Sequence, residues 1–220
     1  MEGQADARQS RFMGTPTHEI GLQDTALLVI DMQYLDAHID YGLCRRARDA
    51  GEDISYYRDR LQLVVPNIAE LLAAFRARKM EVIYSHIASL TPDGRDRSRS
   101  HKKAGLHAPL GTREAQILDE IAPIDGEIVL PKTVSSVFVG TTIDYVLHNI
   151  GISTLVLTGV LTSGCVYSAM HDAYNRNYNI VLVEDACADL DREFHQTSID
   201  VFRVAAMVTS TQDLLKALPD

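Results

Sequence analysis

The sequence predicts a three-layer α/β/α domain, with a Rossmann-like, mostly parallel central sheet between two layers of helices. Two observations predict this class. Short apolar segments alternate along the chain with longer amphipathic segments, and this order is typical of parallel sheets with helical connections. The apolar segments are also apolar at consecutive positions, as expected for strands that helices bury on both faces.

The strands are predicted from these apolar runs. The first run, TALLVID at residues 25–31, ends in an acidic residue. Later runs are shorter, and several are followed by glycine or a polar residue, where strands usually end. The further strands are expected at residues 81–85, 127–130, 154–158, 180–184 and 207–209.

The helices are predicted from apolar residues at helical spacing. Residues 56–79 place Leu63, Ile68, Leu71, Leu72 and Phe75 on one face. Pro66 is expected in the first turn of the main helix, after a short separate piece, because proline is tolerated there. Further helices are expected at residues 139–149, 163–175, 192–204 and 211–217.

We interpret residues 25–220 as one domain and residues 1–24 as a polar N-terminal arm. The net charge of −9 argues against nucleic acid or an anionic membrane as a partner. No apolar run is long enough to cross a membrane, and the first residues lack the apolar core of a secretory signal. Three widely spaced cysteines fit a reducing compartment, so we expect a cytoplasmic protein without disulfides.

A long irregular segment, residues 90–112, interrupts the alternation of strands and helices. Loops of this length in a compact domain are usually functional. Its basic part, GRDRSRSHKK at residues 94–103, is interpreted as a solvated loop, with a lid over an anionic substrate as the alternative. The histidines of this and later segments, among them His101 and His195, are expected on the surface or on helices.

Reactive side chains lie at the ends of predicted strands. Asp31 ends the first strand, Lys132 follows the third, and Cys165 follows the fourth. In a parallel sheet, active sites lie at the carboxyl ends of the strands, so these side chains are expected to meet. Each has an ordinary alternative: a helix cap for Asp31, a surface lysine for Lys132 and a small buried hydrophobe for Cys165.

The surroundings of Cys165 favour a nucleophile. A strand leads through Gly159 and Gly164 into a predicted helix, which places the thiol in its first turn. The positive end of a helix favours the thiolate, and its free N–H groups can hold an oxyanion. Cys187 is interpreted as a core residue. Cys44 lies in the basic segment CRRAR, which favours a lowered pKa, but no other reactive residue is arranged around it.

Three sequence blocks resemble the isochorismatase-like superfamily of cysteine hydrolases, which includes N-carbamoylsarcosine amidohydrolase, nicotinamidase and ureidoacrylate hydrolase. The blocks are ALLVIDMQ at residues 26–33, LPKTVSSVF at residues 130–138 and the long block LVLTGVLTSGCVYSAMHDAYNRNYNIVLVEDACAD at residues 155–189. The resemblance covers residues 25–215, nearly the whole predicted domain.

The resemblance implies a catalytic triad of Asp31, Lys132 and Cys165. It also implies a cis peptide bond between Val160 and Leu161, and an oxyanion hole formed by the N–H groups of Leu161 and Cys165. Further residues are expected near the substrate. These are Gln33, Tyr34, His86, Ser136, Phe138 and Tyr167, for each of which a core, hydrogen-bonding or subunit-contact role is the alternative.

The expected activity is cleavage of a C–N bond in a small amide, carbamoyl or ureido compound through a thioester. Nicotinamidases carry an Asp-x-His metal motif that is missing after the second strand, so we expect no metal and no cofactor. The family usually forms homo-oligomers, dimers or tetramers. The alternatives are vinyl-ether hydrolysis of the isochorismatase type, which Cys165 argues against, and a non-hydrolytic thiol-redox or scaffold protein.

Overall fold

The computed structural model describes residues 16–219, so residues 1–15 of the predicted arm and residue 220 lie outside the described part. The sheet confirms the predicted fold class. Its strands lie in the order β3-β2-β1-β4-β5-β6, and every neighbouring pair is parallel. The strands are β1 Thr25–Ile30, β2 Glu81–Ile87, β3 Ile128–Lys132, β4 Thr154–Val160, β5 Asn179–Ala188 and β6 Met207–Thr209.

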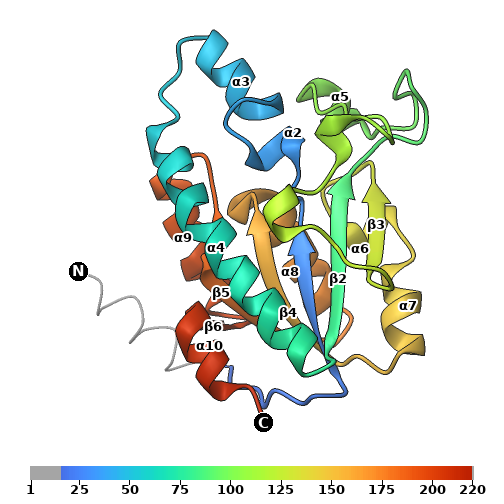
Figure 1. Cartoon of the computed structure of the whole chain (residues 1–220), viewed down its shortest axis with the longest axis vertical. Helices are drawn as coiled ribbons and strands as arrows, with labels where there is room; N and C mark the ends of the chain where they lie inside the picture. The colour runs from blue at the N-terminus through green and yellow to red at the C-terminus, as the bar shows by residue number, and fades with distance from the viewer. Residues whose placement is uncertain (1–15, 220) are drawn as a thin grey trace.

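Helices cover both faces of the sheet. The helices are α2 Tyr34–Ala37, α3 Gly42–Asp49, α4 Ser55–Ala77, α5 Arg99–Lys103, α6 Val137–Gly140, α7 Ile143–Asn149, α8 Tyr167–Tyr174, α9 Arg192–Phe202 and α10 Thr211–Ala217. Figure 1 shows α4 in front of the sheet and α8 behind it. None of the helices described within residues 16–219 is both long and apolar enough to cross a membrane.

The apolar run of β1 is divided between two cores. Leu28 and Ile30 pack in one cluster with residues of α6, α7 and α8, whereas Leu27 and Val29 pack in the other with residues of α4. Successive side chains of a strand point to opposite faces, so only a run that is apolar at every position satisfies both cores. This arrangement explains why the strand pattern identified the fold class.

The prediction for Pro66 is wrong. The single helix α4 runs from Ser55 to Ala77 with Pro66 inside it. Its buried face includes Tyr57 and Leu61 before the proline and Leu71 and Phe75 after it, so packing on both sides outweighs the missing hydrogen bond. Leu63, which was expected on this face, is 44% exposed.

Two other predicted helices differ from the structure. The helix expected at residues 139–149 is two helices, α6 and α7, because Thr141 between them is extended. The helix expected from residue 163 begins only at Tyr167. Before it, residues Thr162–Val166 form one wide turn in which Gly164 has non-helical dihedral angles, φ −106° and ψ −105°. Cys165 therefore lies in a turn that precedes the helix.

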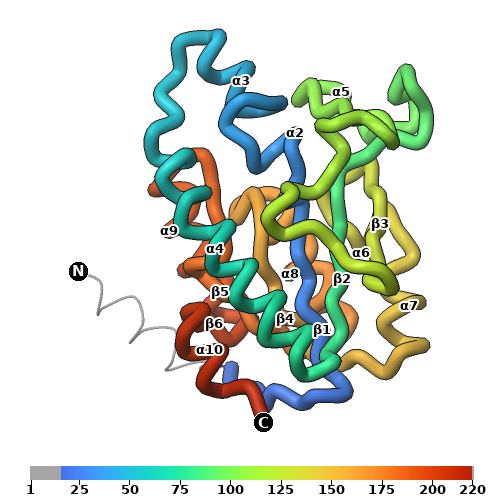
Figure 2. Tube along the Cα trace, viewed as in Figure 1, coloured from blue at the N-terminus to red at the C-terminus, as the bar shows by residue number. Residues whose placement is uncertain are grey.

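Three short helices lie beyond the carboxyl ends of the strands. They are α2, α3 and α5, and the last belongs to the long segment of residues 90–112 (Figure 2). Backbone hydrogen bonds join this segment to the strand ends, from Ser89 N to Ala108 O at 2.9 Å and from Ser98 N to Thr133 O at 2.9 Å. Arg46 of α3 donates to Gly105 O at 2.6 Å. The segment is thus an ordered cover over this end of the sheet.

Candidate active site

The backbone of Asp31, the residue directly after β1, is held in a defined conformation. Asp31 has a φ of 54°, a left-handed conformation that is uncommon for a residue with a side chain and more accessible to Asp than to most others. Its N–H donates to Ser85 O at 2.8 Å. Its side chain is 1% exposed, and Oδ1 has no hydrogen-bond partner among the described residues. This oxygen is positioned to accept a proton.

Lys132 forms hydrogen bonds to the other two predicted catalytic residues, Asp31 and Cys165. Its Nζ donates to Asp31 Oδ2 at 2.7 Å, to Cys165 Sγ at 3.3 Å and to Val134 O at 3.2 Å. An ammonium group has three hydrogen atoms to donate, and each of these acceptors takes one. Burial alone would lower the pKa of Lys132, but the charge of Asp31 and the Cys165 sulfur raise it well above its usual value. Lys132 is therefore a cation at neutral pH.

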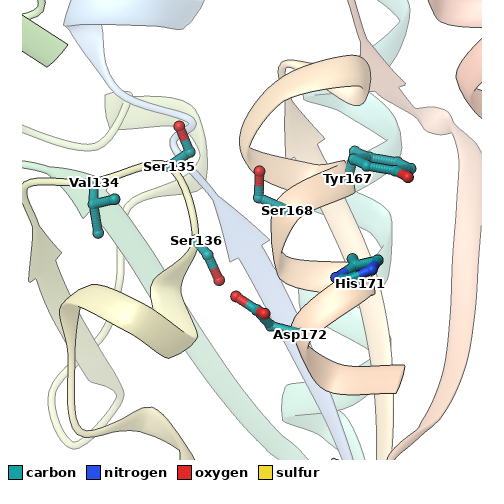
Figure 3. A pocket seen from close by; sticks show the side chains of 7 residues that line it. All are labelled: Val134, Ser135, Ser136, Tyr167, Ser168, His171 and Asp172. Atoms are coloured by element: carbon teal, nitrogen blue, oxygen red, sulfur yellow. The ribbon is translucent and has the colours of Figure 1, made fainter. Parts of the chain in front are cut away.

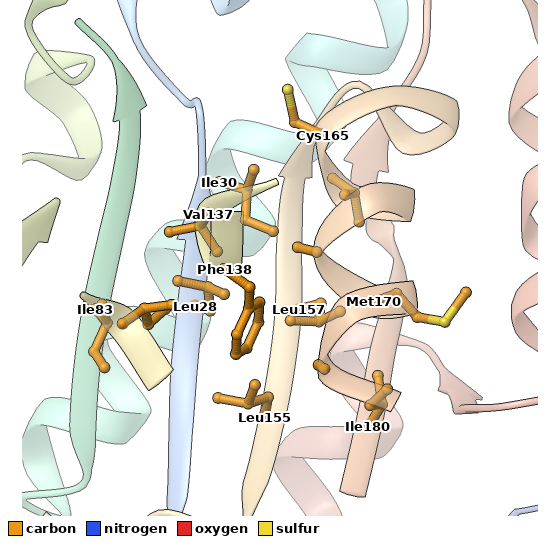
Figure 4. Close-up of a cluster of buried hydrophobic side chains, with 14 of the residues drawn as sticks. Leu28, Ile30, Ile83, Val137, Phe138, Leu155, Leu157, Cys165, Met170 and Ile180 are labelled. Carbon is orange, nitrogen blue, oxygen red and sulfur yellow. The ribbon is translucent and has the colours of Figure 1, made fainter. Parts of the chain in front are cut away.

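Cys165 lies at the top of the core behind the sheet (Figure 4). Burial and then the charge of Asp31 raise the pKa of its thiol far above the usual value, although Lys132 opposes this shift. Cys165 lies just before α8 and not in its first turn, so that part of the prediction is corrected. The raised pKa keeps the thiol of Cys165 protonated at neutral pH.

The turn that carries Cys165 includes the two predicted oxyanion donors. The Val160–Leu161 peptide bond is cis. Leu161 O accepts hydrogen bonds from Gly164 N at 2.9 Å and Val166 N at 3.2 Å. Within residues 16–219, the Leu161 N–H donates to no other backbone group. Before the turn, Gly159 has a φ of 116°, and a Cβ there would lie 2.0 Å from Ile30 O. Only glycine allows this approach of β4 to β1.

A buried polar network holds the turn from behind. Thr162 Oγ1 lies 2.9 Å from His195 Nδ1, and Arg60 Nη2 lies 3.1 Å from His195 Nε2. Arginine only donates, so Nε2 accepts and the proton of His195 is on Nδ1, which donates to Thr162. Burial lowers the pKa of His195 to about 4. His195 lies on helix α9, one of the two positions expected for it, and is 7% exposed.

Thr162→Val is expected to destabilise the protein by about 1–3 kcal/mol, because the N–H of buried His195 then has no acceptor. Urea unfolding measures this loss. In the double variant Thr162→Val/His195→Leu, most of the loss should return, since neither partner is left unpaired. Equal stability of Thr162→Val and the parent would exclude the network as a support of the turn.

A second carboxyl group, not predicted from the sequence, lies near the first. Asp36 of α2 is 5% exposed. Burial and then the charge of Asp31 raise its pKa to about 8, although Lys132 and Arg46 oppose the rise. Asp36 is therefore largely protonated at neutral pH.

The raised pKa of Asp36 predicts a pH dependence of stability. The folded protein holds this proton up to about pH 8, whereas the unfolded chain loses it near the usual carboxyl pKa of 3.8. The contribution of Asp36 is complete below pH 3.8 and is lost as the pH rises toward 8. Asp36→Asn should gain stability over the parent through this window, by at most about 1.4 kcal/mol per pH unit. Urea unfolding of both proteins at several pH values measures it, and a pH-independent difference would refute it.

Three further predicted residues are engaged in hydrogen bonds and stacking. Gln33 is fully buried; it donates to Ile87 O at 2.9 Å and Glu114 O at 2.8 Å, and accepts from Ile87 N. Tyr34 stacks on His38, and its hydroxyl accepts from Arg113. His86 Nδ1 donates to Ala115 O at 2.6 Å, and burial lowers its pKa. These contacts join β1 and β2 to residues 113–115.

The other candidates lie between α8 and the loop after β3. A pocket of about 370 Å³ is lined there by Val134, Ser135, Ser136, Tyr167, Ser168, His171 and Asp172 (Figure 3). Ser136 also caps α6 by accepting from Phe138 N at 3.3 Å. Phe138 itself belongs to the core, with its ring 5.7 Å from that of Tyr178. Of the six tentative substrate residues, Ser136 and Tyr167 therefore line this pocket.

The environment of Cys44 differs from the expectation. Cys44 is 1% exposed, and burial raises its pKa to about 11, so the nearby arginines do not make it acidic. His101 lies on helix α5, one of the two positions expected for it, and is 2% exposed. Among residues 16–219, no group of three or more His, Cys, Asp or Glu side chains could hold a metal ion.

The fold and this group of side chains define an α/β enzyme with a buried thiol, carboxylate and ammonium at the carboxyl edge of a parallel sheet. The isochorismatase domain model matches residues 25–213, so the chain belongs to the isochorismatase family of hydrolases. This match confirms the resemblance that the three sequence blocks indicated.

The chain is similar to enzymes of known name. It is 33% identical over 183 residues to the ureidoacrylate amidohydrolase RutB of Variovorax paradoxus (strain S110), covering 76% of this chain and 69% of that protein. It is 32% identical over 193 residues to RutB of Agrobacterium fabrum, covering 79% of each. The crystal structure of N-carbamoylsarcosine amidase from Thermoplasma acidophilum superposes with a TM-score of 0.65 at 28% identity, covering 86% of this chain and 96% of that one.

Proposed function

We propose that the protein is a cysteine-dependent amidohydrolase that cleaves a C–N bond of a small carbamoyl or ureido compound through a thioester intermediate. The observation that carries the proposal is the position of Lys132 Nζ, which donates to both Asp31 Oδ2 and Cys165 Sγ in a buried site. The relatives support the substrate class, because two are named for a ureido compound and one for a carbamoyl compound.

In the first half-reaction, Asp31 accepts the thiol proton as Cys165 Sγ attacks the substrate carbonyl. Negative charge develops on the carbonyl oxygen, and the N–H groups of Leu161 and Cys165 stabilise it. The S–C bond is then complete, the C–N bond breaks, and the proton on Asp31 passes to the leaving ammonia or amine. The acyl group remains on Cys165 as a thioester.

In the second half-reaction, Asp31 removes a proton from water, and the resulting hydroxide attacks the thioester carbonyl. The C–S bond breaks, the proton returns from Asp31 to the sulfur, and a carboxylate or carbamate product leaves. Lys132 keeps its proton throughout because its pKa is raised. Its role is to offset the negative charge that moves between Asp31 and the sulfur.

The proposal is tested by measuring ammonia release from a panel of small amides. The panel contains N-carbamoyl amino acids, ureidoacrylate, biuret, maleamate and nicotinamide, each with the parent protein and with Cys165→Ala. Release that depends on Cys165 from a carbamoyl or ureido member is the expected result. Release from none of them, together with vinyl-ether cleavage of isochorismate, would overturn it. The homo-oligomer and the cytoplasmic location stay predictions.

A further inference from the structure

Polar groups without partners gather at the catalytic end of the sheet. Asp31 Oδ1, Asp36 Oδ2, Ser89 Oγ and both ring nitrogens of His101 have no hydrogen-bond partner among the described residues. The four residues are at most 5% exposed. More than nine-tenths of buried polar groups in proteins are hydrogen-bonded, so several unpaired groups in one place indicate a site that a polar ligand completes.

The covering elements place two of these residues at the catalytic centre. Asp36 belongs to α2, directly after β1, and its carboxyl group interacts electrostatically with Asp31, Lys132 and Cys165. His101 belongs to α5, and Lys132 is one of the two cations that act on it. Figure 1 shows α2 and α5 beyond the strand ends, where the hydrogen bond from Ser98 to Thr133 holds the start of α5 next to Lys132.

The side chains of Asp36 and His101 are both uncharged at neutral pH. Burial, and then the charges of Lys132 and Arg97, lower the pKa of His101 to about 4, so its imidazole is uncharged at neutral pH. A neutral imidazole offers one N–H donor and one acceptor, and a protonated carboxyl group offers one O–H donor and a carbonyl acceptor. A ligand that satisfies both must itself combine N–H donors with a carbonyl acceptor and carry no charge in that part.

We propose that Asp36 and His101 are substrate-specificity residues that recognise the uncharged ureido end of the substrate. The inference rests on the proposed function, which it deepens by naming what selects the substrate. A ureido group carries two nitrogen donors on one carbonyl, and each unpaired atom of Asp36 and His101 matches one of these functions. An N-acetyl group has the same shape but replaces the terminal NH₂ by a methyl group. Binding of an N-acetyl compound would therefore leave one buried polar atom of the site without a hydrogen-bond partner. An unpaired atom of this kind makes a site discriminate strongly against the analogue that lacks the NH₂ group.

The test measures binding without turnover. Isothermal titration calorimetry with Cys165→Ala compares N-carbamoyl-β-alanine with N-acetyl-β-alanine. We expect about tenfold or stronger preference for the carbamoyl compound, since one unpaired buried group costs at least that factor. Adding Asp36→Ala or His101→Leu should abolish the preference, whereas Asp36→Asn and His101→Gln, which keep a donor and an acceptor, should retain most of it. Asp200→Asn, at an exposed position of α9 (Arg192–Phe202), is the control and should leave the preference unchanged.

Unfolding temperatures separate recognition from a structural role. Neither unpaired group contributes a hydrogen bond to the fold, so His101→Leu should melt at or above the parent temperature, and this variant alone decides the test if Asp36→Ala does not fold. An unchanged preference in the folded Ala and Leu variants, or no preference in the Cys165→Ala background, would overturn the inference. Ammonia release by the parent protein is measured in parallel. If the parent protein releases no ammonia but the binding preference for the carbamoyl compound is intact, the proposed function is overturned and the recognition by Asp36 and His101 remains.

Discussion

Cys165→Ala is expected to lower kcat for the preferred ureido substrate by about 10⁴-fold or more, because alanine cannot form the thioester through which both half-reactions pass. The fold should be retained, since Cys165 contributes a small side chain at the edge of the core. Ammonia release measures the loss. Mass spectrometry of acid-quenched parent protein should detect an acyl adduct on Cys165, and the variant should carry none.

Cys44→Ala is the matched control for this experiment. Cys44 is as buried as Cys165 or more so, but it lies in α3 and its thiol makes no contact with Lys132 or Asp31 among the described hydrogen bonds. Its replacement should leave kcat within about threefold of the parent, because it tests only the general cost of losing a buried thiol. If Cys165→Ala kept more than about a hundredth of the parent activity, the sulfur would not be the nucleophile.

Sequence reasoning predicted that Asp31, Lys132 and Cys165 lie together, because their positions follow from the fold. Asp31, Lys132 and Cys165 each lie at or just beyond the end of a parallel strand, and the carboxyl ends of such strands converge. The continuous apolar run of β1 identified the buried sheet for a related reason, since its apolar residues face two cores in turn. Both inferences depend on regular geometry, which the order of residues expresses directly.

The residues that the sequence did not reveal are fixed by the cover over the strand ends. The helix α5 contains only five residues, too few to show a periodicity, so nothing marked His101 as buried. Asp36 lies in a four-residue helix and was indistinguishable from a surface acid. The position of Cys165 relative to α8 was also predicted incorrectly, because one residue with non-helical angles, Gly164, delays the start of α8 to Tyr167. Such features depend on tertiary packing and local turns.

Lys132→Met is expected to cost about 3–5 kcal/mol of stability, because it leaves the carboxylate of Asp31 buried without its ion pair. The Lys132 and Asp31 side chains are 0% and 1% exposed, and their charged atoms lie 2.7 Å apart. Methionine fills nearly the same volume as lysine, so the expected loss comes from charge rather than from a cavity. Urea unfolding at pH 7 measures it. Activity should fall as well, since the charge moving between Asp31 and the sulfur is no longer offset.

A surface pair provides the comparison that isolates burial. Lys216 and Asp213 form an ion pair at 3.1 Å with side chains 73% and 68% exposed, and Lys216→Met should cost no more than about 1 kcal/mol. In the double variant Asp31→Asn/Lys132→Met, stability should return most of the way to the parent, because no unpaired charge remains, whereas activity should not return. Equal losses from Lys132→Met and Lys216→Met would contradict a buried ion pair at the centre of this site. Recovery of stability without activity would show that the pair is retained for its chemistry, at a cost in stability that a neutral site would avoid.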